Sequence, residues 1–157
     1  MHRSIVAGFS ATVALAGLVF TGLAFGQAAS PPLAKFQIKD GAIAASLTGT
    51  PGDANRGRAV AINRQQGNCL ACHVISRLSN EPYHGNVGPS LDGVASRLSE
   101  GEMRLRIVDP TKLNPDTLMP PFYRVDGLNK VMTQFQGKPI LTAQQVEDVV
   151  AFLKTLR

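Results

Sequence analysis

The residues best suited to chemistry stand together in one short motif, Cys69-Leu70-Ala71-Cys72-His73. Two thiols three residues apart, followed at once by an imidazole, form the C-x-x-C-H string at which haem is attached covalently in c-type proteins. One helical turn presents both thiols on the same side, where they can bond to the two vinyl groups of a single porphyrin. The next side chain, His73, is then carried beneath the ring and offers a nitrogen to iron. The motif predicts one covalent haem c, held by Cys69 and Cys72, with His73 as its first axial ligand.

Three other uses of this motif are disfavoured. A thioredoxin-type redox site needs a βαβ setting, and no strand is evident before Cys69. A zinc site needs about four ligands, and the spacing of Cys69, Cys72, His73 and His84 matches no common zinc pattern. A local disulfide would leave His73 without a role. The sequence contains only two cysteines, so they cannot join distant segments, and local chemistry is the better interpretation.

The second axial ligand must come from farther along the chain. The candidates are the methionine and histidine side chains downstream of the motif: His84, Met103, Met119 and Met132. Met119 is favoured because two prolines follow it, and their restricted φ angles stiffen a loop that must hold a thioether at a constant distance from iron. Met103 is expected to pack in a helix, and Met132 lies in a segment without visible support. Packing in the core is the alternative role for Met119.

Helices are expected on either side of the haem motif. Asp53 is a good N-cap for a helix that runs to about Gln65 and leads into the motif. Thr142 and Gln145 form a capping box, and apolar residues then recur at helical spacing to the end of the chain. A third helix begins at the capping box of Ser99 and ends before Pro110.

The segments between these helices are expected to be mostly irregular. Residues 74–90 contain prolines and glycines and predict a loop, followed by a short helix after Ser90. Residues 110–122 hold four prolines and therefore exclude a regular helix or a central strand. Residues 123–141 predict a turn-rich excursion with a small hairpin or strand around Val131 and Ile140.

The chain divides into three parts by composition. Residues 4–26 contain no charged side chain, Arg3 precedes them, and small residues follow, which is the layout of a secretory signal in residues 1–26. A retained membrane anchor is the alternative, but the run is rich in Gly and Thr, and no stable membrane insertion is expected. Residues 27–52 predict an arm on a surface, with Phe36, Ile38, Ile43 and Leu47 as its contacts. Residues 53–157 predict the haem domain.

The charge balance excludes one class of partner. The formal net charge of +5 includes Arg3 of the predicted signal, so the exported surface is only mildly basic. No run of Lys and Arg interleaved with aromatic residues occurs, so no nucleic-acid binding is expected.

The order of these motifs resembles that of the class I c-type cytochromes. The match consists of the haem motif, then Gly88-Pro89-Ser90-Leu91, then Met119-Pro120-Pro121-Phe122, then a terminal amphipathic helix. The resemblance implies a small all-α fold in which the N- and C-terminal helices cross around one haem. It also implies that the Pro89 carbonyl accepts a hydrogen bond from the axial histidine. Gly57 is placed to lie at the helix crossing, against Phe152 or Leu153, although it is otherwise a merely tolerated helix glycine.

The likeness is most detailed to the X subunits of the bacterial Sox thiosulfate-oxidizing cytochrome complexes. It covers residues 36–157, and its most specific parts are residues 40–53, LNPDTLMPPFY at 113–123 and LTAQQVEDVVAFLKTLR at 141–157. This resemblance implies a periplasmic heterodimer with a larger cytochrome, the A subunit. The complex acts as an L-cysteine S-thiosulfotransferase that joins thiosulfate to a cysteine thiol of the Sox carrier protein. The X subunit accepts the electrons and passes them to a downstream soluble cytochrome.

Two other functions remain open from the sequence. One is a free-standing electron shuttle, which would not need the arm at 27–52 or the excursion at 123–141. The other is a haem sensor or peroxidase, which would need a labile sixth site and is disfavoured by a rigid methionine loop.

Overall fold

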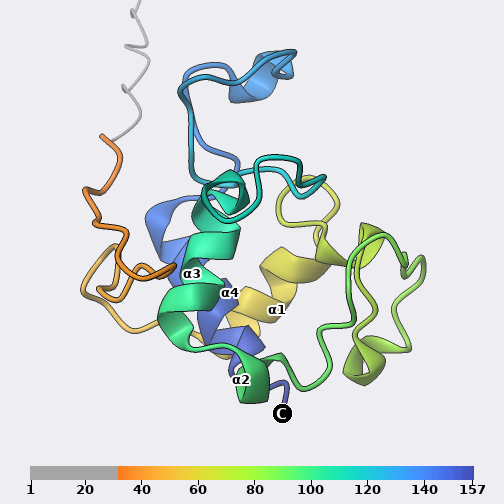
Figure 1. Cartoon of the computed structure of the whole chain (residues 1–157). Helices are drawn as coiled ribbons and strands as arrows, with labels where there is room; N and C mark the ends of the chain where they lie inside the picture. Colours follow the sequence, from red (N-terminus) through yellow and green to blue (C-terminus); the bar gives the residue numbers. More distant parts are fainter. Residues whose placement is uncertain (1–31) are drawn as a thin grey trace, which may run out of the picture.

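Helices form the whole regular structure of the part of the chain that the computed structural model describes, residues 32–157 (Figure 1). The α-helices are α1 (Ala54–Ile62), α2 (Val94–Arg97), α3 (Glu100–Val108) and α4 (Ala143–Leu153). Short 3₁₀ helices cover Cys69–Ala71, Ser76–Leu78, Pro110–Lys112 and Thr133–Phe135. Within residues 32–157 no strand occurs beyond one isolated bridge, so the predicted all-α class is confirmed. The predicted signal, residues 1–26, lies outside the described residues.

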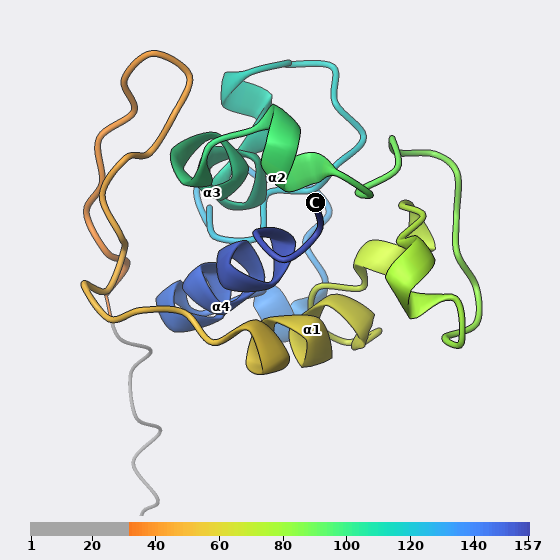
Figure 2. The same ribbon diagram turned by 90° about the horizontal axis from the view of Figure 1, so that it is seen from below.

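The closest contact between helices joins α1 to α4 near the two ends of the domain sequence (Figure 2). A Cβ added to Gly57 would lie 1.9 Å from the carbonyl oxygen of Asp148 and 2.9 Å from Cβ of Phe152. A Cβ at Gly52, just before α1, would lie 2.0 Å from the carbonyl oxygen of Glu147. Two glycines therefore let the backbone at the start of α1 lie directly on that of α4, and the predicted crossing at Gly57 is confirmed.

Side-chain capping explains where three of the four α-helices named above begin. The Asp53 carboxylate accepts from the Arg56 amide at 2.8 Å and caps α1. Both predicted capping boxes are complete, at Ser99 for α3 and at Thr142 for α4. Two predicted helix ends are wrong. Helix α1 ends at Ile62 and not near Gln65, and α4 ends at Leu153, three residues before the buried Leu156.

The segment at 123–141 differs most from its prediction. No strand or hairpin forms around Val131 and Ile140; the regular element there is the 3₁₀ helix Thr133–Phe135. The hydrogen bonds within residues 125–139 are local, such as that from the Phe135 amide to the Met132 carbonyl at 2.8 Å. Residues 125–139 project from the helical body, so few contacts with other segments of the chain are available to order them as strands (Figure 1).

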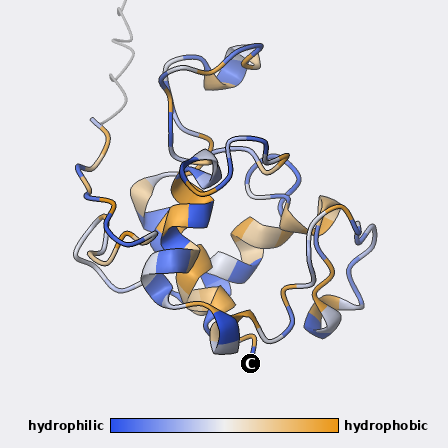
Figure 3. Cartoon of the chain, in the orientation of Figure 1, coloured by the Kyte–Doolittle hydropathy of each residue, from blue (hydrophilic) through white to orange (hydrophobic). Residues whose placement is uncertain are grey.

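The core lies between α1, α3 and α4, whose apolar faces meet (Figure 3). Met103 on α3 is 2% exposed, as predicted for a core residue. The largest side chains that are less than 2% exposed are all aliphatic: Ile43, Ile75, Leu78, Leu105, Leu141, Val108, Val146 and Val150. Helix α4 is buried over most of its length because α1 covers one face and α3 another.

The described part of the predicted arm lies on the haem domain itself. Asp40 and Gly41 have positive φ values, 50° and 70°, and close a tight turn between Lys39 and Ala42. After this turn Ile43 is fully buried and its amide donates to the Gly101 carbonyl at 3.0 Å. Phe36, before the turn, is 37% exposed. The surface that the arm contacts includes α3, α4 and Tyr123, whose hydroxyl accepts from the Ala34 amide at 2.8 Å.

A buried ion pair joins the arm to both of these helices. Arg104 on α3 contacts Glu147 on α4 through two bonds, Nε to Oε1 at 2.8 Å and Nη2 to Oε2 at 2.9 Å. The third nitrogen of Arg104 donates to the Ile43 carbonyl at 2.7 Å, and Glu147 accepts from the Leu47 amide at 2.8 Å. Both side chains are more than nine-tenths buried. Hydrogen bonds to the backbone of the arm satisfy polar atoms that the ion pair alone would leave unpaired.

A second carboxylate of α4 anchors the start of α1. Asp148 accepts from the Asp53 amide at 2.8 Å and from Arg56 through Nε at 2.8 Å and Nη2 at 2.9 Å. Burial opposes ionisation, but the hydrogen bonds from Arg56, the Asp53 amide and Gln144 hold the pKa of Asp148 below its ordinary value. The ionised carboxylate therefore supports the crossing of α1 and α4.

We predict that Gly57→Ala destabilises the protein strongly. The added methyl group would overlap the Asp148 carbonyl, and separating the helices should cost about 2–3 kcal/mol, more than the about 1 kcal/mol that alanine gains by helix propensity. Urea unfolding of the haem-loaded protein measures the loss. Gly127→Ala is the control, because open space surrounds Gly127 and only its φ of 65° opposes a side chain, at about 1 kcal/mol. Equal losses in the two variants would contradict the prediction.

Candidate haem site

The turn that carries the two cysteines follows directly from α1. The amide of Gly67 donates to the Val60 carbonyl at 3.2 Å, and the amide of Asn68 donates to the Asn63 carbonyl at 3.0 Å, so the chain folds back on the end of the helix. The 3₁₀ helix Cys69–Ala71 then brings the Cys72 amide to 3.2 Å from the Cys69 carbonyl. Residues three apart in such a turn share one side, which is the arrangement that two thioether bonds to one ring require.

The imidazole of His73 is oriented by a backbone carbonyl. Its Nδ1 lies 2.6 Å from the carbonyl oxygen of Pro89. A carbonyl oxygen only accepts, so this contact places the proton on Nδ1 and leaves the lone pair of Nε2 for a metal. Histidine ligands of metals are commonly held in this way, so the observed contact fits an axial ligand of haem iron.

Two glycines allow the loop after the motif to lie flat against it. A Cβ at Gly88 would lie 2.3 Å from Cε1 of His73, which is closer than van der Waals contact allows. The Gly88 amide donates to the Cys72 carbonyl at 2.8 Å, and the Gly85 amide donates to the Leu70 carbonyl at 2.7 Å. Sequence reasoning gave Gly88 no role of its own, although its place before Pro89 was a signal of a close backbone approach.

The two thiols are not paired with each other. Cys69 and Cys72 are both free of disulfide bonds. Burial raises the pKa of the Cys69 thiol to about 11, and the nearby Cys72 adds to the effect. A thiol that attacks disulfides needs a lowered pKa, so Cys69 is unlike the nucleophile of a thioredoxin-type site.

Met119 lies in a separate loop that follows α3. Its side chain is partly buried and packs against the apolar core, as does Cys69. Its amide donates to the Thr117 hydroxyl at 3.2 Å, and the backbone after the two prolines returns to α3 through the Phe122 amide, 3.0 Å from the Ile107 carbonyl. The loop is thus supported at both ends and by its own turns.

The other candidates for the second axial ligand are placed less suitably. Met132 is 61% exposed on the excursion. His84 uses both ring nitrogens within its own loop, with Nε2 3.0 Å from the Leu78 carbonyl and Nδ1 3.4 Å from the Ile75 amide. Within residues 32–157, no group of three or more His, Cys, Asp and Glu side chains gathers that could hold a metal ion, so the donors of a zinc site do not converge.

A small helical fold, a C-x-x-C-H turn with unpaired thiols and a histidine held by a proline carbonyl together define a c-type cytochrome of class I. The chain belongs to the cytochrome c family, whose family model matches residues 54–157. Members of this family carry a covalently bound haem c, and the residues described above fit that group.

The comparison with solved structures is more detailed. A chain in the crystal structure of SoxXA from P. pantotrophus is 41% identical in sequence, with a TM-score of 0.72. The match covers 77% of this chain and 93% of that chain. No curated protein matches the sequence. These findings confirm the resemblance to the X subunits that the sequence indicated. No helix in residues 32–157 is long and apolar enough to cross a membrane.

Proposed function

We propose that this chain is the monohaem electron-transfer subunit of a periplasmic, heterodimeric thiosulfate-oxidizing complex. Joining thiosulfate to a cysteine thiol forms one S–S bond and releases one proton and two electrons. The chain accepts these electrons one at a time and passes them to a downstream soluble cytochrome. In this scheme it belongs to an L-cysteine S-thiosulfotransferase complex and is not catalytic alone.

The observation that carries the proposal is the likeness to a chain of SoxXA over 93% of that chain's length. The cysteine count supports the division of labour between subunits. The sequence has two cysteines, both in the haem motif, so no thiol remains to form a bond with sulfur substrates. The bond-forming chemistry is therefore assigned to the larger A subunit and to the cysteine of the Sox carrier protein.

The placement of the site residues supports the roles that we propose for them. Cys69 and Cys72 hold the haem through thioether bonds, and His73 provides Nε2 as the first axial ligand while Pro89 keeps its ring in orientation. Met119 provides the second axial ligand from a loop stiffened by prolines. Haem c supplies an iron that takes up and releases single electrons, and methionine ligation favours its ferrous state.

Two segments exceed what a minimal electron shuttle needs. Phe36 and Ile38 of the arm expose 37% and 41% of their surface, and Met132 of the excursion exposes 61%. Such partly exposed apolar side chains on segments that stand at the edge of the domain support a lasting protein partner. The predicted division into a signal (1–26), an arm (27–52) and a haem domain (53–157) agrees with an exported subunit of this kind.

Size-exclusion chromatography of a periplasmic fraction, followed by haem absorbance, tests the proposal. We expect this chain to elute together with the larger A subunit. Adding thiosulfate and the carrier protein to the isolated complex should reduce the haem of this chain, and omitting either should leave it oxidised. Elution as a free monomer whose haem responds to neither addition would favour a free-standing shuttle.

Met119→Ala should remove the weak near-infrared band that thioether ligation gives to ferric haem. It should also lower the reduction potential, because loss of the thioether removes its preference for the ferrous state. Absorption spectroscopy and redox titration of the haem-loaded protein measure both effects. Met103→Ala and Met132→Ala are matched controls, and a band that persists in Met119→Ala would move the ligand elsewhere.

The exposed part of the arm should contribute to binding of the A subunit. Replacing Phe36 and Ile38 together with serine should weaken that association about tenfold, the equivalent of roughly 1.4 kcal/mol, without changing the haem spectrum. Calorimetric titration against the A subunit measures the affinity.

Ile43→Ala is the matched variant within the same arm. Ile43 is fully buried, so its truncation should lower the free energy of unfolding by about 3 kcal/mol but leave the affinity of the folded protein unchanged. An unchanged affinity in the double serine variant would show that the arm packs only on its own domain.

A further inference from the structure

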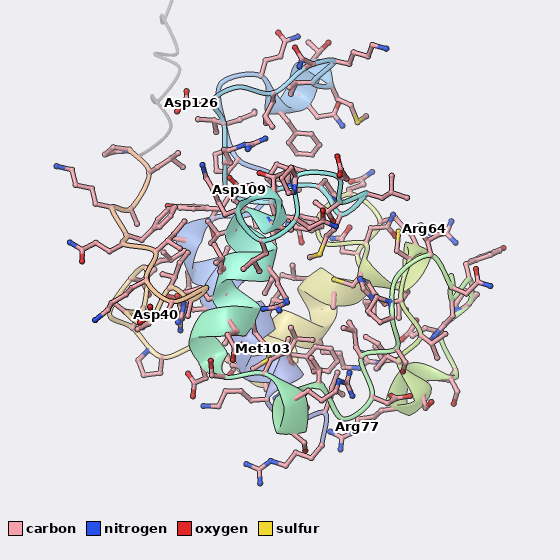
Figure 4. All side chains as sticks on the ribbon, viewed as in Figure 1. Asp40, Arg64, Arg77, Met103, Asp109 and Asp126 are labelled. Atoms are coloured by element: carbon pink, nitrogen blue, oxygen red, sulfur yellow. The ribbon has the colours of Figure 1, made fainter. Side chains whose placement is uncertain are left out.

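The loop that carries Met119 begins and ends at the same place on α3. Asp109 follows the last residue of α3, and Arg124 stands five residues after Met119. The returning backbone pairs with the helix end, since the Tyr123 amide donates to the Val108 carbonyl at 3.3 Å. Figure 4 shows Asp109 at this end of the helix. Any group that joins Asp109 to Arg124 therefore closes the base of the methionine loop.

Three side chains make that closure, and we call them the loop-base clamp: Asp109, Thr111 and Arg124. Nη1 of Arg124 donates to Asp109 Oδ2 at 3.2 Å and to the Thr111 hydroxyl at 3.0 Å. The Thr111 hydroxyl donates in turn to Asp109 Oδ1 at 2.6 Å, and the Thr111 amide reaches the same oxygen at 3.2 Å. The three groups thus form a closed ring of hydrogen bonds.

The clamp is largely shielded from water, so its ion pair and hydrogen bonds hold the loop base more strongly than exposed ones would. The Asp109 side chain is 4% exposed and that of Arg124 is 28% exposed. Nε of Arg124 is buried and has no hydrogen-bond partner among the described residues. The guanidinium therefore acts on the other two residues through the single nitrogen Nη1, and an ammonium group is a suitable replacement for it.

We propose that the loop-base clamp holds the Met119 loop in its closed position and thereby keeps the thioether on the haem iron. The inference rests on the proposed axial role of Met119 and assigns Arg124 and Asp109 as positioning residues. Without the clamp, the loop samples an open state in which the sixth position is accessible to another ligand. The fraction of time spent open sets the apparent affinity for such a ligand.

Imidazole is the probe, and ferric haem-loaded protein is titrated with it while the near-infrared band is followed. In Arg124→Met the apparent affinity for imidazole should rise about tenfold, because the open fraction rises by the same factor. Arg124→Lys should bind imidazole with an affinity near that of the wild-type protein. Arg106→Met is the matched control, since Arg106 donates to the Glu102 carbonyl within α3 and does not contact the clamp.

Thr111→Val provides a second test that does not depend on the charge of Arg124. It leaves the ion pair but removes the hydroxyl from the ring of hydrogen bonds, so imidazole affinity should rise in the same direction. This variant decides the question if Arg124→Met does not accumulate with haem.

The outcomes separate this inference from the proposed function. If Arg124→Met and Thr111→Val both bind imidazole like Arg106→Met, while Met119→Ala loses the near-infrared band, the clamp is wrong and the axial assignment stands. If Met119→Ala keeps the band, the axial assignment fails and the clamp fails with it.

Discussion

The direct contact between the backbones of α1 and α4 is the constraint on which the other parts of the structure depend. Gly52 and Gly57 bring the start of α1 onto the carbonyl groups of Glu147 and Asp148, with no side chain between them. Helix α1 leads within a few residues to Cys69, so the position of α1 determines where the haem motif stands. Because interiors are close-packed, even one methyl group at this contact would have to move a whole helix.

Charged residues on the inner face of α4 join separate parts of the chain to that contact. Glu147 binds Arg104 of α3 and the Leu47 amide, and the adjacent Asp148 binds Arg56 and the Asp53 amide. A buried ion pair adds little net stability over apolar packing, but removing one partner leaves an uncompensated charge and is costly. The buried pair of Arg104 and Glu147 therefore acts mainly on specificity, because the arm and α3 each have one position on α4 that satisfies the Glu147 carboxylate.

Much of the helical framework was predictable because its signals are local. Asp53, Ser99 and Thr142 each cap the helix that follows them, and Pro110 follows Asp109, the C-cap of α3, all within a few residues of sequence. The haem motif was likewise predicted from a short string, whereas the contact of His73 with Pro89 was implied by the resemblance to the class I cytochromes. The caps and the motif need no knowledge of which segments meet in space.

The predictions that went wrong or fell short concern contacts between distant segments. The Asp40-Gly41 pair is a turn signal within the sequence, but only the structure shows that the turn directs Ile43 into the core. The burial of Arg104 and Glu147, 43 residues apart, has no local signature, since charged helical residues are ordinarily exposed. The hairpin or strand expected near Val131 and Ile140 did not form, because the projecting segment has no neighbouring strand among the described residues to pair with.

The two loops that flank the proposed haem differ in how they are made rigid, and the difference has a physical reason. The loop on the His73 side lies flat on the motif through backbone hydrogen bonds and close contacts at Gly85 and Gly88. The loop on the Met119 side cannot do the same, because its prolines lack the amide protons that such bonds need. It depends on restricted φ angles within the loop and on side chains at its base. The position of Met119 is therefore sensitive to substitution of side chains at the loop base, whereas that of His73 is sensitive to substitution of Gly85 and Gly88.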